Sequence, residues 1–178
     1  MSGTRRTFTV PPAMNGKRVR LHFGGVDYRS WVFVNGQPAG THVGGNAAFH
    51  CEITQFRKEG ANEVVVKVLD DLWSGLQPAG KQSGSDQSAG CFYTRTTGIW
   101  QPVWLEAVGS SFVEEISVVS DPDNGRVLIT AKINGSDQDL TLKAEAFADG
   151  KPVGSDTASG PWQNTLVLNL KEKKLWEP

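Results

Sequence analysis

Polar and apolar residues alternate along most of the chain, in short segments that turn-forming residues separate. Residues 18–23 alternate strictly, which places Val19, Leu21 and Phe23 on one face and the three polar residues between them on the other. Residues 31–34 then run into Asn35-Gly36, a pair that favours a type I′ turn and a returning strand over residues 37–43. The pattern therefore predicts antiparallel β-strands.

The next segments differ in how the apolar residues are spaced. Residues 62–69 are apolar at nearly every position, which predicts a strand that is covered on both faces. Between residues 70 and 90 the pattern stops, and so long a loop on a β scaffold is a typical place for a binding site. In residues 99–106, Trp100 and Trp104 share the face opposite the aliphatic residues, and Pro102 predicts an edge strand or a bulge.

After residue 109 the turn signals become regular. They separate predicted strands near residues 112–120, 126–133, 139–147 and 163–170, a spacing that suggests a small immunoglobulin-like sandwich. Residues 142–147 contain helix-forming side chains, but six residues between two turns are too few for a stable helix, and their apolar positions keep a period of two. We therefore expect a strand there.

Length and charge limit the classes of function. A chain of 178 residues is long enough for one large or two small domains but too short for an enzyme barrel of about 250 residues. Eighteen basic and nineteen acidic residues, spread without long runs, make nucleic acid an unexpected partner. The sequence has no apolar stretch long enough for a membrane span or a signal peptide, which predicts a cytoplasmic location without membrane contact.

The metal-binding residue types do not form a recognisable site. Cys51 and Cys91 lack a CxxC spacing, so two free thiols are expected, with a disulfide between them as the alternative. His22, His42 and His50 lie in separate segments and are interpreted as histidines on exposed sheet faces. We predict no metal and no cofactor.

The sequence also shows no catalytic motif. Residues 75–82 match GxxxxGK, but Gln82 replaces the Ser or Thr that would hold magnesium, and residues 83–86 cannot open a helix. The adjacent pairs at 70–71 and 114–115 do not read as an acid/base couple. The six tryptophans, suited to packing or to sugar stacking, are mostly expected to pack; Trp73, in the loop, is the one expected to be most exposed.

Several short motifs occur together in a distinctive order. They are Gly25-Val26-Asp27, Val34-Asn35-Gly36, Gly44-Gly45, Ile53-Thr54, Gly60-Ala61-Asn62-Glu63 and Gly98-Ile99-Trp100-Gln101. Over residues 5–109 the chain resembles the sugar-binding domain of glycoside hydrolase family 2. The resemblance implies an all-β fold: a jelly-roll (galactose-binding-like) sandwich over residues 1–109, followed by an immunoglobulin-like sandwich over residues 110–178, both shortened relative to the family.

The resemblance also implies a parent enzyme. Family members hydrolyse β-glycosides with retention, using two carboxyl groups about 5–5.5 Å apart on a (β/α)8 barrel that this chain does not include. Asn62-Glu63 imitates the family's Asn-Glu acid/base dipeptide but begins a sandwich strand, so no catalytic residue is predicted here. We expect a non-catalytic fragment that supports the cleft of a β-galactosidase-like enzyme; a free-standing carbohydrate-binding module and a purely structural sandwich are the alternatives.

Two residues are candidates for sugar binding. The family position that matches Asp27 can accept a sugar hydroxyl, and the alternative is a turn-forming aspartate before Tyr28. Arg95 either lines the pocket or pairs with an acid elsewhere. A second sugar-binding acid of the family falls at Phe92, which departs from the pattern. Shortened domains would also leave unpaired strand edges, which predicts a homodimer through those edges.

Overall fold

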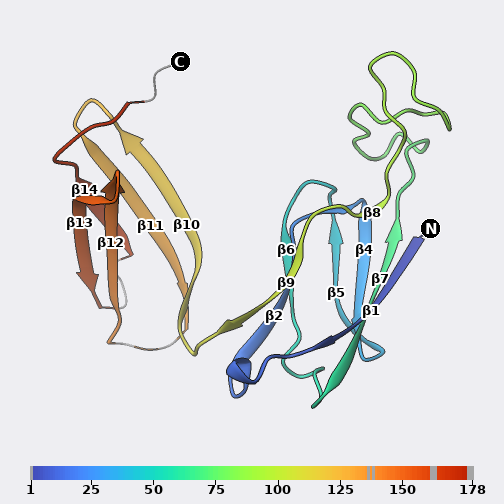
Figure 1. The fold of residues 1–178 in the computed structure, drawn as a ribbon, viewed down its shortest axis with the longest axis horizontal. Coiled ribbons are helices and arrows are strands. Elements are labelled where there is room, and N and C mark those ends of the chain that lie inside the picture. Colours follow the sequence, from blue (N-terminus) through green and yellow to red (C-terminus); the bar gives the residue numbers. More distant parts are fainter. Residues whose placement is uncertain (1, 136, 138, 161–163, 176–178) are drawn as a thin grey trace. The chain divides into compact units, whose positions relative to one another are not determined.

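The structure, a computed structural model, describes residues 2–135, 137, 139–160 and 164–175. The chain divides into two compact units, Met1–Val108 and Gly109–Pro178. Strands make up both units (Figure 1), and the described residues contain no α-helix, only the short 3-10 turn η1 (Pro12–Met14). The predicted all-β fold is confirmed.

The first sheet of unit 1 has four antiparallel strands in the order β1-β7-β4-β5. Their bounds are β1 (Ser2–Thr9), β4 (Arg29–Val34), β5 (Gln37–Val43) and β7 (Ala61–Leu69). Asn35 and Gly36 both have positive φ, 51° and 80°, between β4 and β5. The predicted hairpin is therefore confirmed.

The second sheet of unit 1 has the order β6-β2-β9, and β3 and β8 form a separate short pair. The bounds are β2 (Arg18–Phe23), β3 (Val26–Asp27), β6 (Phe49–Glu52), β8 (Gly98–Ile99) and β9 (Val103–Val108). Among the described strands, β9 pairs with β2 alone and forms an edge, as Pro102 predicted. On the outer face of this sheet, His22 stacks on Trp104, and its Nε2 is hydrogen-bonded to Glu106 Oε2 at 2.8 Å.

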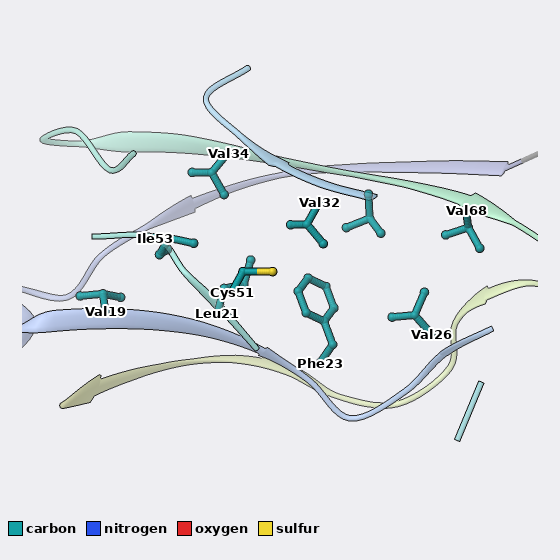
Figure 2. Close-up of a cluster of buried hydrophobic side chains, with 10 residues drawn as sticks. Val19, Leu21, Phe23, Val26, Val32, Val34, Cys51, Ile53 and Val68 are labelled. Atoms are coloured by element: carbon teal, nitrogen blue, oxygen red, sulfur yellow. The ribbon is translucent and has the colours of Figure 1, made fainter. Parts of the chain in front are cut away.

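The core of unit 1 lies between its two sheets. Val19, Leu21 and Phe23 of β2 are at most 4% exposed, as their alternation predicted. Figure 2 shows the ring of Phe23 among Val26 and Val32, so that side chains of both sheets meet around it. Phe23 also stacks on Phe49 with ring centroids 4.8 Å apart.

The prediction that residues 62–69 are covered on both faces is wrong. Val66 and Val68 are buried in the core, but Lys67 and Leu69 of the opposite face are exposed. Val65 of that outer face is half-buried, because β7 is a central strand and Arg5 and Phe33 flank Val65 across the sheet. Neighbouring side chains, rather than a second layer, thus give partial cover to this apolar position.

Unit 2 contains one three-stranded sheet, β10-β11-β14, and one two-stranded sheet, β12-β13. The bounds are β10 (Phe112–Asp121), β11 (Arg126–Asn134), β12 (Thr141–Ala148), β13 (Lys151–Ser159) and β14 (Thr165–Asn169). Four of these strands were predicted, including the one over residues 142–147. Strand β13 was missed because its apolar side chains are few, and because a register shift opposite Ala146 and Phe147 disrupts their alternation. The immunoglobulin-like assignment stays a prediction.

Both cysteines are free thiols, as expected; Cys51 is buried in the core of unit 1 and Cys91 is exposed. Burial raises the pKa of the Cys51 thiol from its ordinary 9.0 to about 11. Between these values the folded chain binds a proton that the unfolded chain has lost, so stability falls as pH rises.

We therefore expect the Cys51 thiol to cost unit 1 on the order of 2–3 kcal/mol of unfolding free energy between pH 8 and pH 12. Urea unfolding at a series of pH values measures this as the difference between the natural chain and Cys51→Ala, in which this loss should be absent. Cys91→Ala is the matched control and should keep it. Equal alkaline losses in the natural chain and in Cys51→Ala would contradict the prediction.

Candidate functional site

A hollow of about 720 Å³ opens where three segments of unit 1 meet. These are the end of β3 with Asp27 and the following Tyr28, the β5-β6 connection at residues 44–47, and the long loop between β7 and β8 with Trp100 just after β8. Tyr28, Tyr93 and Trp100 contribute aromatic rings to the lining, and Asp27 and Gln82 contribute polar groups. Aromatic faces beside a few fixed polar groups suit a saccharide, whose ring has an apolar face and a hydroxyl edge.

Asp27 lies in a strand and not in a turn. It pairs with Gly98 across the β3-β8 ladder, which fixes its backbone at the edge of the hollow. Gly45 lies against its carboxylate, since a Cβ atom at that glycine would be 2.6 Å from Oδ1. The sugar-binding and the turn-forming interpretations of Asp27 both stay predictions, with Asp27 placed at the edge of the hollow.

The loop of residues 70–97, the green excursion beyond β7 in Figure 1, is tied down by its own polar side chains. At its base, Asp70 accepts hydrogen bonds from Gln77 at 2.5 Å and from Thr97 at 2.6 Å, which joins the two ends. Trp73 donates Nε1–H to the carbonyl of Gly84 at 2.8 Å. The loop thus has a defined conformation beside the hollow.

Gln82 connects this loop to Asp27. Its Nε2 donates to Asp27 Oδ2 at 2.9 Å, and its Oε1 accepts the backbone N–H of Thr96 at 2.8 Å. Burial raises the pKa of Asp27, the Gln82 hydrogen bond lowers it, and the charge of Asp70 raises it; the net shift is upward. Asp27 therefore presents a partly desolvated carboxyl group to the hollow.

Arg95 does not line this hollow. Its Nη2 donates to Asp86 Oδ1 at 3.0 Å, and its guanidinium lies over the ring of Trp73 at 4.2 Å. In the structure Arg95 thus pairs with an acid of its own loop, and a sugar-binding role for Arg95 stays a prediction. Phe92, the departure from the family pattern, is half-exposed and also lies outside the lining.

The other candidates are placed as follows. Trp73 is the most exposed tryptophan described, at 63%, as predicted, but Trp100 and Trp104 pack less than expected and are 53% and 46% exposed. Trp162 and Trp176 lie outside the described residues. The ring centroids of His22 and His50 lie 5.2 Å apart, while His42 stacks on Phe49 instead.

Two features are absent from the described part of the chain. No group of three or more metal-ligating side chains gathers there. None of its helices has the length and apolar character needed to cross a bilayer. Asn62, half of the dipeptide that imitates an acid/base pair, is buried and bonded to its own turn.

Sequence reasoning missed the residues that complete the hollow. In the sequence, Gln82 is notable only as a replacement in a phosphate-loop motif, and Tyr93 belongs to no motif. Asp27 and Gln82 are 55 positions apart, and no periodic pattern links a strand to a loop at that separation. The aromatic content of the loop was the one available signal.

Comparison with known proteins gives a consistent picture. The model of "Glycosyl hydrolases family 2, sugar binding domain" matches residues 2–107. A protein of Formosa agariphila, assigned to the β-glucuronidases, is 30% identical over 97% of this chain and 21% of its own length. The β-galactosidase BoGH2A of Bacteroides ovatus is 28% identical over 97% of this chain and 20% of its own length.

Solved structures agree with the fold. The crystal structure of an FMN-binding β-glucuronidase from Facaelibacterium prausnitzii superposes with a TM-score of 0.74 at 24% identity, covering 98% of this chain and 27% of that chain. The chain spans 16–30% of the length of the first three curated relatives that it matches. Because the family model covers more than half of the chain, this protein belongs to glycosyl hydrolase family 2, with residues 2–107 as its sugar-binding domain.

Proposed function

We propose that this chain is a non-catalytic part of a retaining β-glycoside hydrolase and that unit 1 forms one wall of the sugar pocket. The observation that carries the proposal is the hollow that Asp27, held by Gln82, lines together with Tyr28, Tyr93 and Trp100. A carboxylate oxygen can accept sugar hydroxyls, and the rings offer apolar faces to the same ligand. The two acids that cleave the bond would come from another part of the parent protein.

The proposed substrate class is a β-glycoside. The β-galactosidase-like parent that the sequence predicts is a more specific version of this proposal. Relatives that are named β-galactosidase and relatives that are named β-glucuronidase align over nearly the whole chain. Both sugars therefore belong in the test. The cytoplasmic location, the homodimer through strand edges and a sugar-binding role of Arg95 stay predictions.

The test replaces the aligned region of the Bacteroides ovatus β-galactosidase with this chain. The 178-residue chain alone is expected to leave nitrophenyl β-galactoside and β-glucuronide intact and to show no binding of either sugar by calorimetry. In the chimera, Asp27→Asn is expected to raise KM by about 10- to 100-fold, because a hydrogen bond to a charged acceptor is lost. Asp71→Asn, which changes an exposed acid of the loop of residues 70–97, is the matched control.

Three outcomes would count against the proposal. Hydrolysis by the isolated chain would show that it is catalytic. Sugar binding by the isolated chain, lost in Asp27→Asn, would favour the free-standing carbohydrate-binding module. An active chimera whose KM is the same for Asp27→Asn and Asp71→Asn would remove Asp27 from the pocket.

A further inference from the structure

The carboxylate of Asp27 has two unequal oxygens. Oδ2 accepts the amide of Gln82, whereas Oδ1 has no hydrogen-bond donor among the residues that the structure describes. Oδ1 lies against Gly45, where only a glycine leaves room for it. Trp100 holds that glycine by donating Nε1–H to its carbonyl at 2.7 Å.

The orientation of the Gln82 amide follows from its second partner. A backbone N–H can only donate, so the amide atom that meets Thr96 must be the carbonyl Oε1. The Nε2 group then faces Asp27 and must donate, which makes Oδ2 an acceptor. A flipped amide would lose both hydrogen bonds.

We propose that Gln82 is a positioning residue, whose amide fixes the Asp27 carboxylate with Oδ2 occupied and Oδ1 left as the acceptor for a sugar hydroxyl. The importance of this for sugar binding rests on the proposed function. The same amide also accepts the N–H of Thr96, so that one side chain links the loop to the acid. Asp70 is the charged group that acts on Asp27 from the base of the loop.

The experiment uses the 178-residue chain without any sugar. Carbon-13 NMR of the carboxyl groups follows the titration of Asp27 in the natural chain, in Gln82→Ala and in Gln82→Glu. The pKa of Asp27 is expected to rise in Gln82→Ala, because the donor is lost, and to rise further in Gln82→Glu, because a negative charge then faces the carboxylate. Gln87→Ala, an exposed glutamine of the same loop, should leave it unchanged.

Hydrogen exchange adds a second readout in the same samples. The amide of Thr96 should exchange roughly 5- to 10-fold faster in Gln82→Ala than in the natural chain, since it loses a hydrogen bond. An Asp27 titration that is unchanged in Gln82→Ala, or moved equally by Gln87→Ala, would overturn the proposal. If the pKa of Asp27 shifts as expected but Asp27→Asn leaves the KM of the chimera unchanged, Gln82 positions Asp27 and Asp27 does not bind the sugar.

Discussion

Phe23→Ala is expected to lower the unfolding free energy of unit 1 by about 3–5 kcal/mol, the range for a phenylalanine removed from a packed core. Phe23 is 1% exposed and lies where the side chains of both sheets meet. Its ring also stacks on Phe49 with an interplanar angle of 9°. The cavity cannot close easily, because the strands around it are fixed by the hydrogen bonds of their ladders.

Urea unfolding followed by circular dichroism measures this effect, with amide exchange in β2 reporting on unit 1 separately. Phe92→Ala is the matched control, since Phe92 is 50% exposed in the loop, and it should cost less than about 1 kcal/mol. Phe23→Leu should fall between the two because it refills part of the cavity. Similar losses for Phe23→Ala and Phe92→Ala would show that the ring is not part of a packed core.

Asn62→Ala is the second large effect, with an expected loss of about 2–4 kcal/mol. Asn62 is 1% exposed. Its Oδ1 accepts the N–H of Lys58 at 2.8 Å and Nδ2 of Asn35 at 2.9 Å. Its Nδ2 donates to the carbonyls of Lys58 at 3.0 Å and Gly60 at 3.1 Å.

Alanine at this position would leave those backbone groups and the Asn35 amide without their partner. The loss would reach the β4-β5 turn, because Asn35 also accepts the N–H of Glu63 at 2.9 Å. Asn62→Asp keeps the shape but aims an oxygen at two carbonyls, so it should destabilise at least as much as alanine. The same unfolding experiment with exposed Asn15→Ala as control should show a change within about 0.5 kcal/mol; a loss for Asn62→Ala no larger than that would contradict the prediction.

Asn62 also illustrates how a dipeptide can mislead. Asn62-Glu63 has the letters of a catalytic pair, and its place at the start of a predicted strand argued against that role. The structure gives the asparagine a different task, which is to tie the turn before β7 to the turn after β4. Only the spatial closeness of two turns, separated by more than twenty residues, reveals this.

The sequence by itself determined the all-β class, the Asn35-Gly36 hairpin, the buried face of β2 and the family. These features depend on neighbours in the chain: a period of two, a turn that needs positive φ, and short motifs in a fixed order. Strand β13 was not predicted because a register shift interrupts the alternation of its apolar residues. The prediction that residues 62–69 are covered on both faces was wrong because Val65, on the outer face of β7, is covered only by side chains of the neighbouring strands.

Only the tertiary structure decided the site. Asp27 was chosen through the resemblance, but its partner Gln82, the close contact with Gly45 and the pairing of Arg95 with Asp86 depend on how the long loop folds back. That path is fixed by hydrogen bonds between side chains and backbone, which follow no periodic pattern in the sequence. The alternation of apolar residues thus determined the strands. The hydrogen bonds that fold the long loop back determined which groups line the hollow.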